Sequence, residues 1–220
     1  MDDEKHDFRN QHAFEYQIHD LAGVNDPDIL KAMREIPRHL FVPPELISAA
    51  YYNQALPIGY GQTISQPLIV AYMTNMLRPK STDKILEIGT GSGYQAAILS
   101  KLCKKVYTIE IVEPLAAQAQ KRFEELNLKN IEARAGDGYH GWPEAAPFDS
   151  IILTAAPERI PMELVKQLKV GGKMILPIGR QFNQKLVLLT KAEDGTIHEK
   201  DLIDVIFVPL TRKYDSGSHL

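Results

Sequence analysis

Seven short runs rich in isoleucine, valine and leucine follow Pro79, and they constrain the possible fold more than any other feature of the chain. The runs are KILEIG, KVYTIEI, NIEARAG, FDSIILTAA, GKMILPIG, KLVLLT and DLIDVIFVPL. Helical sequence separates the first four, over Tyr94–Leu102, over Pro114–Leu126 and in a short irregular piece around Trp142. Continuous apolar strands that alternate with helices are typical of a mainly parallel sheet with both faces covered. The sequence therefore predicts a doubly wound α/β fold.

The two ends of the chain differ from this alternating centre. The last three runs are joined by the short turns GRQFNQ and EDGT, which predict antiparallel strands at the C-terminal end. Helices are expected before the sheet, over residues 3–21, from Pro27 with Asp26 as its N-cap, and from Pro67. The sheet is therefore expected to carry an N-terminal helical addition.

No linker rich in proline, glycine or serine divides the 220 residues. We therefore expect a single domain over 1–220, made of an N-terminal helical part (1–78), an α/β core (79–211) and a tail (212–220). Apolar residues make up 44% of the chain and charged residues 24%, which are the proportions of a globular protein rather than of a disordered or fibrous one.

The net charge and the single cysteine limit the expected partners and compartment. There are 25 Lys and Arg against 28 Asp and Glu, so the formal net charge is −3, without the basic surface that a nucleic-acid-binding protein needs. Cys103 cannot form an intrachain disulfide, and the first ten residues are polar and acidic, unlike a secretory signal. We expect a monomeric cytoplasmic protein with neither a nucleic-acid nor a membrane partner.

The charges are unevenly distributed along the chain. Between Glu45 and Arg78 there is no Asp, Glu, Lys or Arg, so residues 46–77 form an uncharged stretch of 32 residues. Polar residues, glycines and prolines interrupt this stretch too often for a transmembrane helix, which needs roughly 20 successive apolar residues. Two interpretations remain open: a buried hairpin and helix, or a neutral lining for a ligand that carries its own charge.

A glycine-rich turn is the strongest local signal. The sequence ILEIGTGSGY (85–94) reads as a strand that leads through a turn into a helix, and glycines let a ligand approach such a backbone closely. Glu110 ends the next strand 21 positions after Gly89, about the ~20-residue separation expected of a carboxylate that binds ribose hydroxyls. The combination predicts a ligand that contains a nucleoside.

Two residues favour a methyl donor over a nicotinamide dinucleotide. The dinucleotide motif G-x-G-x-x-G requires a small residue at position 94, where this chain has Tyr94. Glu87 brings a carboxylate toward the turn, which would repel a pyrophosphate but attract the ammonium or sulfonium of S-adenosylmethionine. Asp137, in a Gly-Asp-Gly turn after the third strand, could accept a hydrogen bond from an adenine amino group. S-adenosylmethionine is therefore the expected cofactor.

Several segments together resemble one methyltransferase family. They are ALPIGYGQTISQP (55–67), LEIGTGSGY (86–94), GDG (136–138), TAAP (154–157), LKVGGKMILPIG (168–179) and VPLT (208–211). In them the chain is similar to class I S-adenosylmethionine-dependent methyltransferases of Rossmann-like fold, and specifically to the protein-L-isoaspartate (D-aspartate) O-methyltransferase family. The resemblance extends from about residue 29 to residue 211.

The resemblance implies both a reaction and the residues that perform it. The family methylates the free α-carboxylate of L-isoaspartyl and D-aspartyl residues in damaged proteins and peptides, which starts their repair, and S-adenosylhomocysteine is the product of the cofactor. The implied cofactor-binding residues are Thr63, Ile64, Glu87, Gly89, Gly91, Gly93, Glu110, Asp137, Gly138 and Thr211. The implied substrate-binding residues are Ala55, Leu56, Pro57, Ile58, Val208, Pro209 and Leu210. Core packing is the alternative for Leu56, Ile58 and Val208.

Ser65 is the catalytic residue that the resemblance implies. Its hydroxyl would donate a hydrogen bond to the substrate carboxylate and orient it toward the methyl group. The alternative is a purely structural role, because a serine shortly before a proline at the start of a helix is a common N-cap. A carboxylate is ionised at neutral pH and needs no general base, which agrees with the lack of any recognisable catalytic triad or metal-ligand cluster in the sequence.

Three other functions compete with this one. A methyltransferase for a nucleic acid or a small molecule is disfavoured by the missing basic patch and by TAAP, where amino-methylating enzymes tend to carry an Asn/Asp-Pro-Pro-aromatic block. A non-catalytic nucleoside-binding protein is disfavoured by the presence of Ser65 with a complete glycine turn. A nicotinamide-dependent dehydrogenase is disfavoured by Tyr94. We expect no metal site, although His12, Glu15 and His19 could share a helix face.

Overall fold

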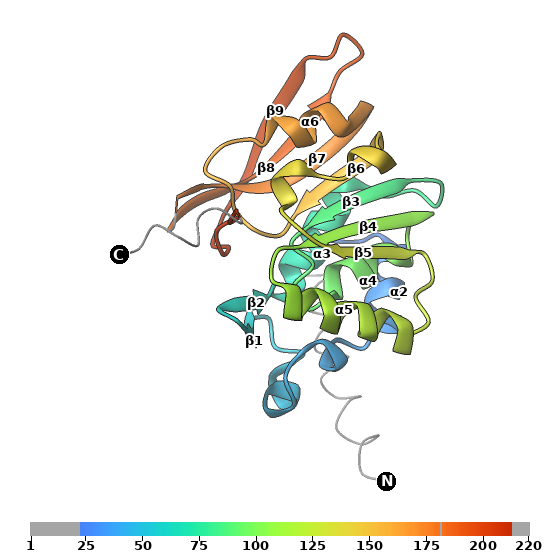
Figure 1. Cartoon of the computed structure of the whole chain (residues 1–220), viewed down its shortest axis with the longest axis vertical. Helices are drawn as coiled ribbons and strands as arrows, with labels where there is room; N and C mark the ends of the chain where they lie inside the picture. The colour runs from blue at the N-terminus through green and yellow to red at the C-terminus, as the bar shows by residue number, and fades with distance from the viewer. Residues whose placement is uncertain (1–22, 181, 213–220) are drawn as a thin grey trace.

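The computed structural model describes residues 23–180 and 182–212, so the helix predicted over 3–21 and residues 213–220 of the tail lie outside it. One seven-stranded sheet organises the described residues (Figure 1). Its strands, in spatial order, are β5 (Ile131–Ala135), β4 (Lys105–Glu110), β3 (Lys84–Ile88), β6 (Phe148–Leu153), β7 (Leu168–Arg180), β8 (Asn183–Lys191) and β9 (Ile197–Val205).

Each of the seven predicted runs contributes to a strand. β5, β4, β3, β6 and β7 are parallel, whereas β8 and β9 are antiparallel to their neighbours, as predicted. The last strand differs from the prediction, because β9 ends at Val205 and the apolar run continues to Leu210. The segment beyond β9 leaves the sheet edge, and its backbone pairs with Ala156 beyond the end of β6.

Helices cover both faces of the sheet. The α-helices of the described residues are α2 (Pro27–Glu35), α3 (Pro67–Leu77), α4 (Tyr94–Ser100), α5 (Glu113–Glu125) and α6 (Met162–Gln167). The described residues also form four 3₁₀ helices: η2 (Arg38–Phe41), η3 (Pro44–Ala49), η4 (Gly138–His140) and η5 (Pro143–Ala145). Asp26 caps α2 as predicted, because its Oδ1 accepts hydrogen bonds from the amides of Asp28 (2.9 Å) and Ile29 (3.3 Å). In the described part of the chain, none of these helices has both the length and the apolar character that crossing a bilayer requires.

The pleat of β3 divides the hydrophobic core between the two faces. Ile85 packs into the cluster that contains residues of α2, α3, α4 and α5. Leu86 and Ile88 join the second cluster, with Trp142 and with Leu164 of α6. Residues of α2 and α3 thus share a core with the sheet, so the N-terminal part is continuous with the α/β core in its packing. Figure 1 shows α4 and α5 on one side of the sheet and α6 on the other.

A hairpin occupies part of the uncharged stretch. β1 (Leu56–Gly59) and β2 (Gln62–Ile64) form an antiparallel pair, and α3 follows directly. The interpretation of this stretch as a hairpin and a helix is therefore correct, although the hairpin is only partly buried. The alternative, a neutral lining for a charged ligand, remains a prediction.

The strand order creates a crevice at the carboxyl ends of β3 and β6. From β3 the chain adds β4 and β5 on one side, then returns to the other side of β3 to form β6. The connections that leave β3 and β6 therefore diverge, and ligands of open α/β sheets bind at such a switch point.

Gly93 fixes how the glycine turn packs, and we expect its replacement to destabilise the protein. Its φ is +89°, and a Cβ there would lie 2.7 Å from Cε1 of Phe123 on α5. Gly93→Ala should lower the free energy of unfolding by about 2–4 kcal/mol, through backbone strain and overpacking together. Gly195→Ala is the matched control, because φ there is +84° but nothing lies within 4 Å. Equal losses in chemical denaturation of the two variants would contradict a clash with Phe123.

Candidate active site

The turn after β3 is held by its neighbours on both sides. The amide of Gly89 donates to the carbonyl of Ile109 on β4 (2.8 Å), and the amide of Thr154 beyond β6 donates to the carbonyl of Ile88 (2.9 Å). Gly89 has φ +97°, and a Cβ there would lie 2.5 Å from Thr154 Oγ1. The glycine is therefore required both by the backbone conformation and by the close approach of β6.

Glu110 lies beneath this turn. Its Oε2 accepts a hydrogen bond from the amide of Gly91 (2.7 Å) and its Oε1 accepts one from the amide of Val112 (3.0 Å). Amide donors stabilise a carboxylate, so Glu110 is held in place as an acceptor at the carboxyl end of β4. The 21-residue separation that the sequence suggested thus corresponds to a direct contact between the acid and the glycine turn.

Glu87 is completely buried beneath the same turn. Glu87 and Thr108 are register partners on β3 and β4, and the Thr108 hydroxyl donates to Glu87 Oε2. Oε1 of Glu87 has no hydrogen-bond partner among the described residues. Burial raises the pKa of the Glu87 carboxyl to about 8, against the opposing hydrogen bond from Thr108. Burial thus favours the protonated form in the ligand-free protein, and the contact of Glu87 with a cofactor remains a prediction.

A pocket opens above the turn, and we call it the glycine-loop pocket. Its walls come from the hairpin, the ends of β3, β4 and β6, and the segment beyond β9. Twelve predicted site residues line it: Thr63, Ile64, Ser65, Glu87, Gly89, Gly91, Glu110, Gly138, Val208, Pro209, Leu210 and Thr211.

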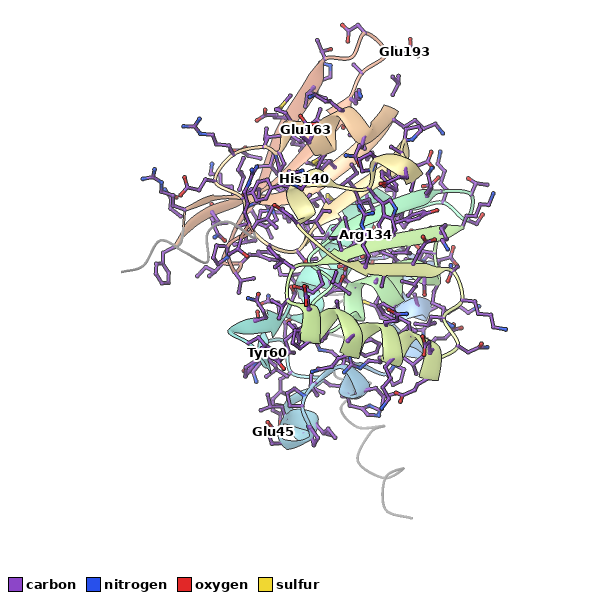
Figure 2. The ribbon with its side chains drawn as sticks, in the orientation of Figure 1. Glu45, Tyr60, Arg134, His140, Glu163 and Glu193 are labelled. Atoms are coloured by element: carbon purple, nitrogen blue, oxygen red, sulfur yellow. The ribbon has the colours of Figure 1, made fainter. Side chains whose placement is uncertain are left out.

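Two of the predicted cofactor-binding residues lie outside the lining of this pocket. Gly93 is the N-cap residue of α4 and faces Phe123. Asp137 caps η4, with its Oδ1 accepting from the amide of Tyr139 (2.9 Å), and its Oδ2 lies 3.7 Å from Nε2 of His140, which Figure 2 labels. Contacts of these two residues with a cofactor remain predictions.

A second, more open space adjoins the first, and we call it the Ser65 groove. It lies between the hairpin, the start of α3 and the β7–β8 turn, with one wall formed by residues 204–208. Thr63, Ser65, Thr154 and Val208 line both spaces. Ser65 therefore lies where the glycine-loop pocket meets the Ser65 groove.

The structural alternative for Ser65 does not hold. The N-cap of α3 is Gln66, which makes no side-chain capping bond. The amide of Leu68 is instead satisfied by Oδ1 of Asn53, at 3.2 Å. The Ser65 hydroxyl makes no hydrogen bond to another described residue, so it is available to a ligand.

The predicted substrate-binding residues fall into two groups. Leu56 and Ile58 are buried in the core, as the packing alternative supposed, while Ala55 and Pro57 are exposed and only Ala55 reaches the groove. Tyr60, labelled in Figure 2, lies at the exposed tip of this hairpin.

The second group is the segment beyond β9, which is fixed from two directions. Val208 and Leu210 pair through their backbone with Ala156, at 2.8 Å each. The buried carboxamide of Gln184 donates to the carbonyl of Phe207 (3.1 Å) and accepts from its amide (2.7 Å). The sequence indicated no role for Gln184, because its partner is 23 residues away.

Two further residues at the site, Thr154 and Arg38, were not predicted from the sequence. Thr154 belongs to the TAAP segment and touches both spaces, but no role was predicted for it. Arg38 donates to the backbone of Ser65 from 27 residues away. The quoted TAAP segment was the available signal for Thr154, whereas the sequence held no signal for Arg38.

The charges around the two spaces favour a cationic ligand in the pocket. Among the described residues, their lining contains Glu87, Glu110 and Asp204 and no lysine or arginine. A pyrophosphate would therefore meet carboxyl groups without a cation to neutralise it, whereas a sulfonium or ammonium favours the ionised form of such groups and is attracted by it. Among the described residues, no group of three or more His, Cys, Asp or Glu could hold a metal ion.

We expect the buried Glu87 carboxyl to make stability depend on pH. The unfolded chain releases this proton near pH 4.5 and the ligand-free folded protein near pH 8, so the stability due to this group falls as the pH rises between these values. Glu87→Gln removes the titration, and its free energy of unfolding should decline less between pH 5 and pH 8, by at least about 1 kcal/mol. Denaturant unfolding at both pH values measures this, with the exposed Glu124→Gln as control. Identical pH dependence in wild type and Glu87→Gln would contradict the burial effect.

Comparison with known proteins connects this site to one family. A family model described as protein-L-isoaspartate(D-aspartate) O-methyltransferase matches residues 9–215. Protein-L-isoaspartate O-methyltransferase 1 of Nitrosospira multiformis is 55% identical over 193 residues, which cover 86% of this chain and 82% of that protein.

Solved structures agree with the sequence comparison. A protein-L-isoaspartate O-methyltransferase superposes with a TM-score of 0.83 at 28% identity, covering 90% of this chain and 65% of the other. A putative protein-L-isoaspartate O-methyltransferase from Plasmodium falciparum, in complex with S-adenosyl-L-homocysteine, has a TM-score of 0.80 at 24% identity over 93% of this chain and 99% of the other, and it shares the fold. Because the family model matches most of the chain and the relatives are this similar, the chain belongs to the protein-L-isoaspartate (D-aspartate) O-methyltransferase family.

Proposed function

We propose that the protein transfers a methyl group from S-adenosylmethionine to the free α-carboxylate of L-isoaspartyl and D-aspartyl residues in damaged proteins and peptides, and so initiates their repair. The observation that carries this proposal is that Ser65 lines both the glycine-loop pocket and the Ser65 groove. A methyl donor in the pocket and a carboxylate in the groove would meet at this residue.

The residues of the pocket fit the methyl donor. Glu110, held by the amides of Gly91 and Val112, is placed to accept hydrogen bonds from ribose hydroxyls. Oε1 of Glu87, which no described residue bonds, can accept from a cationic group, and no basic side chain of the described residues lines the pocket. S-adenosylmethionine supplies a methyl group activated by its sulfonium and leaves as S-adenosylhomocysteine.

The groove supplies orientation rather than acid or base chemistry. The substrate carboxylate is ionised at neutral pH and is itself the nucleophile, so the enzyme needs to align it with the methyl group. The Ser65 hydroxyl can donate to one carboxylate oxygen and direct the other toward the pocket. Within the described part of the chain, no lysine or arginine lines the groove to hold that carboxylate in a competing ion pair.

The substrate main chain has a defined surface to lie along. Residues 207–210 run extended past Ser65, fixed by Gln184 on one side and Ala156 on the other. Contacts with a substrate backbone are indifferent to side-chain sequence, which suits an enzyme that must accept one abnormal linkage in many surroundings.

We also propose a monomeric enzyme of the cytoplasm that binds neither nucleic acid nor membrane. Cys103 is buried, and burial raises the pKa of its thiol to about 12, which supports a structural role in a reducing compartment. The net charge of −3 supports the lack of a nucleic-acid partner.

The deciding experiment compares two peptides that differ in one linkage. Methyl transfer from labelled S-adenosylmethionine is measured with a peptide that contains one isoaspartyl bond and with its normal aspartyl twin. We expect label in the isoaspartyl peptide only, as a base-labile ester. Equal labelling of the two peptides, or of neither, would defeat the proposed function.

We expect Ser65→Ala to lose turnover while keeping the cofactor. Loss of the orienting hydrogen bond should lower kcat for the isoaspartyl peptide about 10²-fold, which is the scale of a misaligned reactant. The Kd of S-adenosylhomocysteine, measured by calorimetry, should change by less than about three-fold. Ser81→Ala, in an exposed turn, is the matched control. Turnover by Ser65→Ala close to that of the control would remove Ser65 from the mechanism.

A further inference from the structure

Arg38 is the largest fully buried side chain of the described residues. It lies at the start of η2 and has no carboxylate partner among those residues. Burying a guanidinium is costly unless its donors are satisfied, and burial lowers the pKa of Arg38 to about 10, which still leaves it a cation at neutral pH. The surrounding structure must therefore compensate for the cost of burying this guanidinium.

Two of the three donor nitrogens of Arg38 reach backbone carbonyls, and Nη1 is buried without a hydrogen-bond partner among the described residues. Its Nε donates to the carbonyl of Ala50 and its Nη2 to the carbonyl of Ser65, each at 2.7 Å. Ala50 and Ser65 lie on either side of the β1–β2 hairpin, so one side chain joins the two ends of the segment that carries it. The Ser65 carbonyl precedes Gln66, the first acceptor of α3, so the helix does not satisfy it.

The same side chain is connected to the cofactor side of the site. The guanidinium lies over the ring of Tyr94, the first residue of α4, with its Cζ 4.9 Å from the ring centroid. Tyr94 meets Phe41 edge to face at 5.3 Å, and Arg122 lies over Phe41 at 5.4 Å. Nη1 of Arg122 donates to the carbonyl of Ser92 in the glycine turn, at 2.5 Å. A continuous series of side-chain contacts therefore connects the backbone of Ser65 to the backbone of the glycine turn.

We propose that Arg38 is a positioning residue that fixes the backbone of Ser65 relative to the glycine turn and so aims the Ser65 hydroxyl at the junction of the two spaces. This rests on the proposed function, because it takes Ser65 as the residue that orients the substrate. A residue that only filled the core would not need a guanidinium, because burying a charge costs free energy that an apolar side chain avoids. An apolar replacement cannot reproduce the two hydrogen bonds that Arg38 donates to Ala50 and Ser65.

The test measures whether Arg38 acts through Ser65. Arg38→Met removes the donors and keeps the volume, and we expect kcat for the isoaspartyl peptide to fall at least about 10-fold. Arg38→Lys keeps the charge but has a single donor atom where the guanidinium uses two, so it should recover only part of kcat. The Kd of S-adenosylhomocysteine should stay within about three-fold of wild type in both variants. Lys121→Met removes one positive charge from the exposed face of α5 and is the matched control.

A double-mutant cycle separates positioning from a general loss of structure. If Arg38 acts through Ser65, Arg38→Met in the Ser65→Ala background should change kcat by less than about three-fold. Multiplicative effects of the two changes would overturn the inference, and so would a cofactor affinity that falls by the same factor as kcat. If Arg38→Met does not fold, Arg38→Lys is carried through the same cycle.

Wild-type enzyme is assayed beside each variant, which separates this inference from the proposed function. A wild type that methylates neither peptide refutes the proposed function. An active wild type with an equally active Arg38→Met refutes only the role of Arg38.

Discussion

The backbone at the end of β3 is held from both sides, and the rest of the site depends on this constraint. Ile109 of β4 accepts from Gly89, and Thr154 beyond β6 donates to Ile88, so the chain must turn in the narrow space between them. Only glycine fits at position 89, and the turn then places its amides above Glu110. The same closeness of β6 brings Thr154 to the place where the pocket meets the groove.

The two acids beneath this turn receive different hydrogen-bond donors. Glu110 receives two backbone amides, whereas Glu87 receives one hydroxyl and keeps one oxygen without a partner among the described residues. Burial raises the pKa of Glu87 to about 8. A carboxyl group in this condition can gain negative charge when a cation arrives, and it avoids most of the cost of holding that charge in an empty pocket.

Short-range patterns predicted most of the sheet, and long-range contacts of polar side chains escaped them. Continuous apolar runs identified the strands, and the spacing from Gly89 to Glu110 indicated that the acid and the glycine turn meet at one sheet edge, because one strand-helix-strand unit has about this length. α6 was missed because six residues are too few to display a helical period. Arg38 and Gln184 were missed because each holds a backbone group far away in the sequence, which no local pattern encodes. The protonation of Glu87 likewise depends on burial that only the fold creates.

The segment beyond β9 leaves one wall of the site outside the sheet. Residues 208–211 form part of the wall of the glycine-loop pocket, yet they follow every strand of the sheet in the chain. Two backbone hydrogen bonds to Ala156 join this wall to the end of β6, whereas each strand of the sheet is held by a whole ladder. The wall can therefore open locally at a lower free-energy cost than the sheet that supports it.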